Sequence, residues 1–364
     1  MKKQICIKGK KYKLPIYLPD ATRAVVKTVD SLDLVKASVK GAVVNTYHLM
    51  TEPGVSVLKK LGGIKAFMNF PGLITSDSGG WQIFSLIHRN KNQGKITDEG
   101  VAFSVGKGNR ELFSPEKSIE TQFDIGSDII VCLDDFTPPR AKKKQIVESV
   151  NRTLKWAKVS KDHYQKLLKQ RKISNKKRPF LFAVIQGDND KELRAYCAEK
   201  LLEMGGFDGF GFGGYPMDEN GRLNLDLAKY VCDLIPNNYF KFALGVGKPQ
   251  EIAACFNFGW QIFDCTLPTR DGRHMRLYVF NKNPKKIDDL MQVKNHGYLY
   301  INREKYRRDQ RKISDFCDCH TCKNYSRSYL HHLFNINDAT AYRLATLHNL
   351  RIYTKTMEVL RQAN

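Results

Sequence analysis

The sequence predicts an α/β fold in which eight parallel strands, alternating with helices, close into a single (β/α)8 barrel over residues 1–364. Eight short apolar runs follow one another along the chain, and most are continuously apolar, as strands buried on both faces are. Helical patterns separate several of these runs, which favours a parallel sheet. A chain of 364 residues with 42% hydrophobic residues can fill a barrel core, and eight strands in this length favour closure over an open sheet.

The individual elements follow from local sequence. The predicted strands are Leu14–Leu18, Ala42–Asn45, Leu73–Ser76, Ile129–Leu133, Phe180–Ile185, Gly209–Gly213, Phe240–Gly245 and Trp260–Phe263. Helices are predicted at Pro115–Ile125, Lys142–Leu168, Asp190–Met204 and Pro249–Phe258. Three of these begin at a Ser, Asp or Pro that favours a helix start, and Lys142–Leu168 is strongly basic. From about Asn281 the charge density rises and a cysteine cluster appears, so we expect residues 281–350 to form a small subdomain built onto the barrel.

Positive charge is in large excess. Lys and Arg number 60 against 37 Asp and Glu, a formal net charge of +23. This excess suggests a polyanionic partner, because neutralising phosphates releases counterions, although a lysine-rich proteome would produce the same bias. The N-terminus lacks the apolar stretch of a signal peptide, and no run approaches the ~18 apolar residues of a membrane span. We therefore expect a cytoplasmic protein that does not span a membrane.

Polar residues and glycines follow the predicted strands. In a parallel barrel, catalytic groups gather at the carboxyl ends of the strands, where the βα loops begin. These ends carry Asn45-Thr46-Tyr47-His48, Asp77-Ser78-Gly79-Gly80-Trp81-Gln82, Asp134-Asp135, Gln186-Gly187, Gly213-Gly214, Gly245-Val246-Gly247 and Asp264-Cys265. Three strands thus deliver an aspartate to one face and a fourth delivers a glutamine, while glycines let a ligand approach the backbone closely. This layout predicts a polar pocket for a planar, hydrogen-bonding substrate.

Each member of this set also has an ordinary explanation. A single aspartate at a strand end is commonly a helix N-cap or a loop residue. Trp81, directly after two glycines, is placed to stack on a base, but a core aromatic residue would look the same in the sequence. The combination of Asp77, Asp134, Gln186 and Asp264 is much harder to obtain by chance than any one of them.

Three of the nine cysteines are packed into six residues. Cys317, Cys319 and Cys322 have C-x-C-x2-C spacing, and thiolates this close in a reducing compartment most often bind zinc. A tetrahedral site needs a fourth ligand, and the nearby candidates are His320, His331, His332 and His348. Four protein ligands leave no open position for water, so we expect a structural Zn2+ site and not a catalytic one. Three incidental cysteines are the alternative.

Several segments in order resemble the tRNA-guanine transglycosylases, of the bacterial type in length, and the resemblance covers nearly the whole chain. The segments that carry it are NTYHLMTEPG (45–54), SDSGGWQIFSL (76–86), SPEKSIETQFDIGSDI (114–129), VIQGD (184–188), FDGFGFGG (207–214), LGVGKP (244–249), FDCTLPTRDGRH (263–274), CDCHTCKNYSRSYLHHL (317–333) and LHNLRIY (347–353). The resemblance implies a pentosyltransferase that exchanges a guanine in the tRNA anticodon loop for a 7-deazaguanine. It also implies a homodimer.

The resemblance assigns roles to individual residues. Asp264 matches the family nucleophile, which would attack the anomeric carbon and form a covalent ribosyl–enzyme intermediate. Asp77 matches the general acid/base that acts on N9 of the base. The positions that match substrate-binding residues are Asp134, Gln186, Gly214, Trp81, Asn45 and Leu244. Arg270 and Arg273 would hold tRNA phosphates beside the target, and the fourth zinc ligand of the family falls on His348.

The chain departs from the family around the base pocket. Trp81 stands where the family usually has Tyr or Phe, and Asp134-Asp135-Phe136 replaces an Asp-Glu-Cys pattern. After Gly214 the chain reads Tyr215-Pro216-Met217-Asp218-Glu219, where the bacterial pattern is small and aliphatic. Because Phe136 and Met217 are bulky, the pocket is expected to prefer a small base, such as 7-aminomethyl- or 7-cyano-7-deazaguanine, over queuine. Pro216 also lacks a backbone N–H to offer.

Three other functions fit part of the pattern. A paralogue that places 7-deazaguanine in duplex DNA would use the same chemistry, although the spacing of FDCTLPTR and of the cysteine loop favours RNA. A non-catalytic subunit that only binds tRNA should have lost one or both aspartates, yet Asp77 and Asp264 are both present. An unrelated zinc-stabilised barrel hydrolase would not share the ordered motifs.

Overall fold

The computed structural model of the protein describes residues 1–80, 84, 94–105, 109–138, 141–214 and 216–363. Trp81 and Tyr215, both named from the sequence, lie outside the described residues. None of the described helices is both long enough and apolar enough to cross a membrane.

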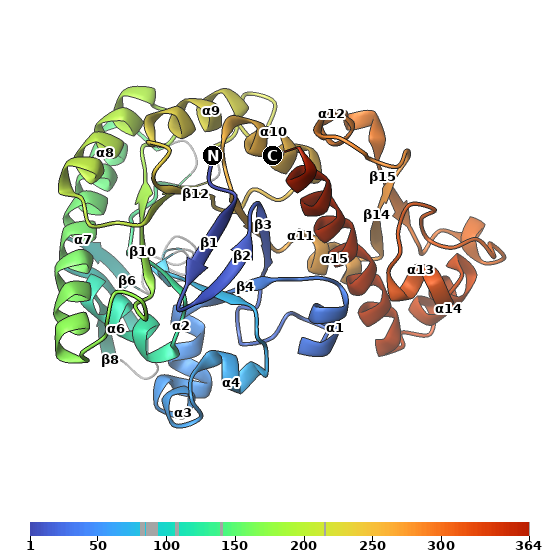
Figure 1. Ribbon diagram of the computed structural model, residues 1–364, viewed down its shortest axis with the longest axis horizontal. Helices are drawn as coiled ribbons and strands as arrows, with labels where there is room; N and C mark the ends of the chain where they lie inside the picture. The colour runs from blue at the N-terminus through green and yellow to red at the C-terminus, as the bar shows by residue number, and fades with distance from the viewer. Residues whose placement is uncertain (81–83, 85–93, 106–108, 139–140, 215, 364) are drawn as a thin grey trace.

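Eight parallel strands form the centre of the molecule and confirm the predicted barrel (Figure 1). In chain order they are β3 (Ile16–Pro19), β4 (Gly41–Asn45), β5 (Leu73–Asp77), β9 (Ile129–Val131), β10 (Phe180–Ile185), β11 (Gly209–Phe212), β12 (Phe240–Ala243) and β13 (Ile262–Cys265). Neighbours in the sheet follow the chain order, and β13 pairs in parallel with β3. A parallel bridge between Asp20 and Val43 joins the ends of β3 and β4, so the barrel is nearly closed.

The barrel strands are buried on both faces. Side chains at alternate positions fill the interior, because successive residues of a strand point to opposite sides of the sheet. The interior cluster contains Ile16, Leu18, Val43, Leu73, Ile129, Val131, Phe182, Val184, Phe240, Phe242 and Ile262. The predicted limits were wrong by one or two residues at every barrel strand except Phe180–Ile185. The last strand runs from Ile262 to Cys265 instead of from Trp260 to Phe263. Asp264 therefore lies within β13 and not in the loop after it.

Helices cover the outside of the barrel. They are α1 (Ser31–Lys36), α2 (Thr46–Leu49), the π-helix η1 (Met50–Gly54), α3 (Val55–Lys60), α4 (Ile64–Met68), α6 (Pro115–Ile125), α7 (Lys143–Gln170), α8 (Lys191–Met204), α9 (Leu225–Leu234), α10 (Pro249–Phe258) and α11 (Leu267–Arg273). Side-chain caps mark where two of these helices begin. The side chains of Ser114 and Asp190 accept hydrogen bonds from backbone N–H groups in the first turns of α6 and α8. The limits of α6 and α10 are those predicted from the sequence. The helices α7 and α8 begin one residue later than predicted.

Three small antiparallel sheets of the described residues were not among the predicted strands, two beside the barrel and one in the C-terminal part described below. The hairpin of β1 (Gln4–Ile7) and β2 (Lys10–Lys13) caps one end of the barrel, where Ile5 and Ile7 join the interior cluster. The second sheet beside the barrel, of β6 (Gly94–Thr97), β7 (Gly100–Val105) and β8 (Asn109–Phe113), lies between β5 and α6 in the chain. Its buried side chains pack on Phe84, Leu133 and Trp156.

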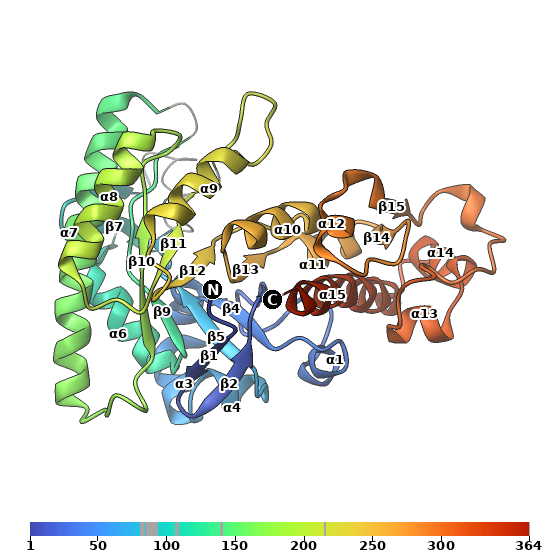
Figure 2. The ribbon, with the colours of Figure 1, turned by 45° about the horizontal axis from the view of Figure 1, so that its top comes forward.

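The chain after α11 builds a projection on one side of the barrel (Figures 1 and 2). It contains β14 (Arg276–Phe280), α12 (Ile287–Met291), the 3-10 helices η3 (Val293–Asn295) and η4 (Glu304–Tyr306), β15 (His296–Tyr300), α13 (His320–Asn324), α14 (Arg327–Asn335) and α15 (Ala339–Gln362). The long helix α15 contacts α11, β14 and β3, so it joins the projection to the barrel. Buried residues of both parts form one continuous hydrophobic cluster.

Gln122 on α6 fixes β5, which ends in Asp77, and β9, which Asp134 follows. This fully buried side chain exchanges two hydrogen bonds with the backbone of Val131 on β9, both of 2.8 Å. It also accepts a hydrogen bond from Ser76 on β5 (2.8 Å) and donates one to Ser118 (3.1 Å). All its hydrogen-bonding groups are satisfied, so it locks α6, β5 and β9 together from outside the barrel.

Candidate active site

Asp77 is the last residue of β5 and is held by neutral donors. Its carboxylate accepts hydrogen bonds from the Asn45 amide (2.8 and 3.0 Å) and from the backbone N–H groups of Thr46 (3.3 Å) and Gly79 (3.0 Å). The φ of Gly79 is +82°, a conformation that favours glycine, and a Cβ atom there would lie 3.0 Å from the backbone nitrogen of Tyr47. Glycine therefore lets this loop reach the carboxylate. Burial raises the pKa of Asp77 to about 6, against the lowering effect of these hydrogen bonds.

Asp264 on β13 lies near enough to Asp77 for the two charges to interact. Its Oδ1 accepts a hydrogen bond from the backbone N–H of Gly245 (2.9 Å), in the loop after β12. Burial raises the pKa of Asp264 to about 7, and the negative charges of Asp77 and Asp20 raise it further. The structure therefore brings together the two aspartates that the sequence singled out, from strands far apart in the chain. With pKa values near neutrality, these carboxyl groups can donate, accept or react as anions at the same pH.

A second polar group lies at the ends of β9 and β10. The Gln186 amide donates a hydrogen bond of 2.7 Å to Asp134, whose other carboxylate oxygen accepts one from Ser78 (3.4 Å). Burial raises the pKa of Asp134 to about 6, while the hydrogen bond from Gln186 lowers it and the charge of Asp135 raises it. A side chain at Gly213 would collide with the Gln186 amide, so glycine is needed beside it. Asp134 and Gln186 together offer donors and acceptors to the edge of a planar molecule.

Two arginines that sequence reasoning missed hold these loops. Arg194 on α8 is fully buried and donates to the backbone carbonyls of Ile185, Asp188 (2.9 Å) and Gly213 (2.9 Å), which fixes the chain on both sides of Gln186. Arg152 on α7 forms an ion pair with the buried Asp135. A signal for Arg194 was present in the sequence, because it shares the buried face of α8 with Cys197, Ala198 and Leu201 at helical spacing.

The remaining residues predicted to bind substrate lie at the same ends of the strands. Gly214 follows β11 with a φ of +72° and is half-buried. Leu244 follows β12 and is also half-buried, with its side chain against Gly211. Asn45 is buried at the end of β4 and orients Asp77, as described above. Trp81 lies outside the described residues, so its stacking on the base stays a prediction.

Phe136 and Met217, the two bulky residues at which the sequence departs from the pattern it resembles, have different surroundings. Phe136 is half-buried, and its ring meets the Phe84 ring edge-on at a centroid distance of 5.2 Å. Met217 is 46% exposed, and its carbonyl accepts a hydrogen bond from Asn189 (3.1 Å), in the loop after β10. Pro216 beside it is buried.

Arg270 and Arg273 follow Asp264 on the short helix α11. Arg270 is exposed. Arg273 is half-buried and its Nη1 atom has no hydrogen-bond partner among the described residues. Burial lowers the pKa of Arg273, and the charge of Arg270 lowers it further, whereas Asp20 raises it. A buried guanidinium nitrogen without a partner costs free energy, so this position favours an anion.

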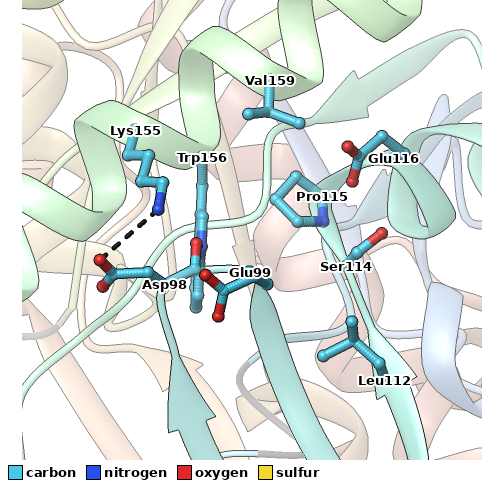
Figure 3. A pocket seen from close by; sticks show the side chains of 9 residues that line it. All are labelled: Asp98, Glu99, Leu112, Ser114, Pro115, Glu116, Lys155, Trp156 and Val159. Carbon is cyan, nitrogen blue, oxygen red and sulfur yellow. Dashed lines mark hydrogen bonds and ion pairs between the residues drawn. The ribbon is translucent and has the colours of Figure 1, made fainter.

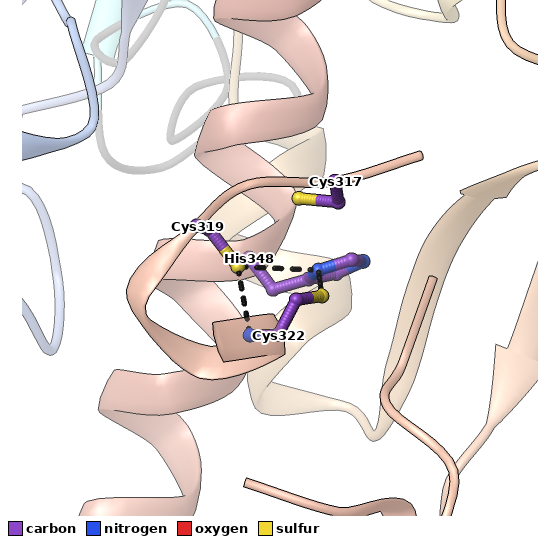
Figure 4. A group of neighbouring side chains, drawn as sticks. All are labelled: Cys317, Cys319, Cys322 and His348. Atoms are coloured by element: carbon purple, nitrogen blue, oxygen red, sulfur yellow. Dashed lines mark hydrogen bonds between the residues drawn. The ribbon is translucent and has the colours of Figure 1, made fainter. Parts of the chain in front are cut away.

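The three clustered cysteines meet His348 of α15 (Figure 4). The four possible ligand atoms of Cys317, Cys319, Cys322 and His348 all lie within 4.8 Å of one another, and the four residues are buried. The Nδ1 atom of His348 is 3.6 Å from Cys319 Sγ and 3.2 Å from Cys322 Sγ. Its Nε2 donates to the carbonyl of Tyr278 (2.7 Å), which leaves Nδ1 free to bind a metal.

The other histidines considered as the fourth ligand lie elsewhere. His331 contacts the carbonyl of Ile301, His320 contacts Asn324, and His332 is exposed. Three thiols and one imidazole nitrogen within 4.8 Å of one another could hold a metal ion, and four protein ligands are typical of a structural metal site.

A cavity of about 370 Å3 lies elsewhere, between α7, the β6–β7 turn and the start of α6 (Figure 3). Trp156 and Lys155 line it on one side, and Asp98, Glu99 and Glu116 on the others. Lys155 and Asp98 form an ion pair of 3.5 Å. None of the residues predicted from the sequence to act on the substrate lines this cavity, so it is not the pocket that the strand ends predict.

Comparison with known proteins confirms the family resemblance. Residues 4–363 match the family model described as queuine tRNA-ribosyltransferase. A protein of that name from Methylacidiphilum infernorum is 35% identical over 350 residues, covering 95% of this chain and 87% of that protein. Proteins of the same name from Staphylococcus haemolyticus and Helicobacter hepaticus are each 36% identical, covering 97% and 96% of this chain and 86% of their own lengths. Since these matches span the barrel, the aspartates and the cysteine cluster together, the chain belongs to the queuine tRNA-ribosyltransferase family.

Proposed function

We propose that the protein is a tRNA-guanine transglycosylase, which exchanges a guanine in the tRNA anticodon loop for a 7-deazaguanine. The related proteins carry the name of an enzyme that acts on tRNA, and the net charge of +23 suits that partner. The observation that carries the proposal is the meeting of Asp77 and Asp264, from separate strands, at one end of the barrel with pKa values of about 6 and 7.

The proposed reaction uses the two aspartates in turn. The Asp264 carboxylate attacks C1′ of the target nucleotide, the C1′–N9 bond breaks, and Asp77 donates a proton to N9 of the leaving guanine. A covalent ribosyl ester on Asp264 results. Asp77 then takes the N9 proton of the incoming base, whose nitrogen attacks C1′ and releases the Asp264 carboxylate. The exchange needs no oxidant and no external energy source, because one C–N bond is broken and one is made.

The surrounding residues would bind the base and the RNA. Asp134 and Gln186 hydrogen-bond the base edge, and Gly214 adds backbone contacts. Leu244, Asn45 and Trp81 complete the binding site that the family resemblance assigns. Arg270 and Arg273 bind phosphates beside the target, and the Nη1 atom of Arg273, which has no partner among the described residues, supports this role. The target nucleotide must leave the loop stack, which costs a few kcal/mol that contacts to phosphates offset.

We further propose a structural Zn2+ held by Cys317, Cys319, Cys322 and His348, supported by the closeness of their four ligand atoms and by the preference of zinc for thiolate and imidazole ligands. The ion would tie the loop before α13 to α15 and supplies no chemistry to the base exchange. Residues 281–350 would then act as a subdomain embedded in one unit of residues 1–364. A cytoplasmic location and a homodimer are also proposed from the family. The exposed ring of Tyr329, stacked on Tyr325 at 5.3 Å, is the kind of surface that subunit interfaces bury.

Asp264→Asn should abolish the incorporation of radiolabelled guanine into tRNA, by about 10³-fold or more, because an amide cannot form the ribosyl ester. The variant should also fail to form a covalent protein–tRNA adduct on denaturing gels. Asp233→Asn, on the exposed face of α9, is the matched control and should retain wild-type turnover. Normal turnover by Asp264→Asn would remove the mechanism, and label entering duplex DNA in place of tRNA would favour the DNA-acting alternative.

Asp264→Asn should also stabilise the protein at pH 8. Because the pKa of Asp264 is about 7 in the folded protein and 3.8 ordinarily, the folded state binds the proton more tightly, and the free energy of unfolding falls as pH rises from about 4 to 7. Removing the buried charge should recover on the order of 1–3 kcal/mol at pH 8 and almost nothing near pH 4. Urea unfolding at both pH values measures this, with Asp233→Asn as control. Equal gains at the two pH values would show that the carboxylate is not buried.

Small bases should exchange better than queuine, since Phe136 and Met217 are bulky at positions where the family pattern has smaller residues. Competition against labelled guanine, with queuine and 7-aminomethyl-7-deazaguanine as rivals, measures the preference. Phe136→Cys restores the family residue and should improve competition by queuine about tenfold, with little effect on the small base. The hypothesis is wrong if queuine competes better than the small bases with the wild-type protein.

Cys319→Ser should release the metal and lower the free energy of unfolding by on the order of several kcal/mol, since ligand binding and folding are coupled in structural sites. Metal analysis of the purified protein would give about one zinc per chain for the wild type. Cys6→Ser changes an exposed cysteine of β1 and should keep the full metal content. The order of preference among competing bases should not change in Cys319→Ser, and a change would indicate that the metal acts in the reaction.

A further inference from the structure

The hairpin of β14 and β15 carries two exposed aromatic side chains. Tyr298 is 41% exposed and Tyr300 is 37% exposed, whereas Leu299 between them is buried. Alternate residues of a strand share a face, so the two tyrosines leave β15 on the same side, about 7 Å apart along the strand. Both tyrosine rings are therefore partly open to a partner on this face of the hairpin.

Each of these rings is paired with an arginine. The guanidinium carbon of Arg276 lies 5.1 Å from the centre of the Tyr298 ring, and that of Arg303 lies 5.0 Å from the centre of the Tyr300 ring. Arg276 is also tied to Asp271 of α11 by an ion pair of 2.6 Å. Cation–π contacts hold the rings in place, and they add positive charge to an aromatic surface, which suits nucleic-acid bases and phosphates together.

The chain that follows β15 is strongly basic. Residues 302–312 contain six basic and two acidic residues, and both acidic residues already form ion pairs. Arg303, Lys305 and Arg308 are exposed and form no ion pair among the residues that the structure describes. An aromatic surface beside unpaired positive charge suits a polyanion that offers bases and phosphates together.

This surface lies on the active-site side of the hairpin. Arg276, whose guanidinium lies over the Tyr298 ring, forms an ion pair with Asp271 of α11. Only Thr266 separates α11 from β13, the strand that carries Asp264. Figure 1 shows β14 and β15 beside α11 and α12, and Figure 2 shows them on the side of the barrel where β13 is labelled.

We propose that Tyr298, Tyr300 and Arg303, here called the β15 platform, bind unpaired nucleotides of the tRNA anticodon arm next to the target nucleotide. The two tyrosines stack on bases and Arg303 binds a phosphate. A spacing of about 7 Å is twice the ~3.4 Å rise of stacked bases, so the platform holds nucleotides that have left their stack. It thereby stabilises the open loop that base exchange requires. This inference rests on the proposed function.

The test compares tRNA binding by three variants of the full-length, zinc-loaded protein. Combined Tyr298→Ala and Tyr300→Ala should raise the Kd for unmodified tRNA about tenfold or more in fluorescence anisotropy, and lower kcat/KM for tRNA with it. The KM for free guanine should stay at the wild-type value. Combined Tyr298→Phe and Tyr300→Phe should bind within about twofold of wild type, because stacking needs the ring and not the hydroxyl. Tyr196→Ala removes a 42% exposed tyrosine from α8 and is the matched control.

Arg303→Gln gives an independent measurement, since this exposed residue can be changed without disturbing the fold. It should reduce the slope of log Kd against log salt concentration by about one. An unchanged slope, or binding by the double alanine variant as tight as that of Tyr196→Ala, would overturn the inference. A change in the oligomeric mass of the double alanine variant, measured by light scattering, would also overturn the inference, because the platform would then be a protein interface. Failure of the wild-type protein to label tRNA at all would instead overturn the proposed function.

Discussion

The active site depends on holding the carboxylates of Asp77 and Asp264 in a partly buried site at the ends of their strands. The donors described for both are neutral: an asparagine amide and backbone N–H groups. Such donors orient a carboxylate but only partly offset the cost of burial, so the pKa values remain at about 6 and 7. Asp309 shows the opposite case, because the Arg311 side chain holds its pKa well below the usual range. A lysine or arginine beside Asp77 would fix it as an anion and remove its capacity to move a proton.

The barrel supplies the rigidity that this arrangement needs. Strands at separate places in the sheet deliver the aspartates, and buried polar side chains hold several of the strand ends from behind. Gln122 joins α6 to β5 and β9, and Arg194 joins α8 to the ends of β10 and β11. Buried groups of this kind must have all their partners, since each unsatisfied donor or acceptor costs about 1–3 kcal/mol. They therefore restrict the backbone of these four strand ends to the arrangement in which Gln186 reaches Asp134.

The sequence predicted the barrel and the residues at its strand ends because those features are local. Continuous apolar runs mark buried strands, and a polar residue directly after such a run must lie at a known end of the sheet. Arg194 was missed because a charged residue on a helix is read as exposed unless its buried neighbours are examined. The sheet of β6 to β8 was missed because polar residues interrupt each of its strands, GKIT, GVAFSV and NRELF, so none reads as a continuous apolar run. Its core also forms with Phe84 and Trp156, which lie outside these strands in the sequence. The choice of His348 over three nearer histidines came from the family, since spacing alone leaves all four open.

The cysteine cluster and the β15 platform are linked through one tyrosine. His348 donates through Nε2 to the backbone carbonyl of Tyr278 on β14, and the hydroxyl of Tyr278 donates to Asp271 on α11. Asp271 also holds Arg276, whose guanidinium covers the ring of Tyr298. A metal bound by His348 would thus fix the position of β14 relative to α11, the helix that begins three residues after Asp264. On this view a metal site that takes no part in the chemistry still determines where the arginines and tyrosines that face the RNA are held.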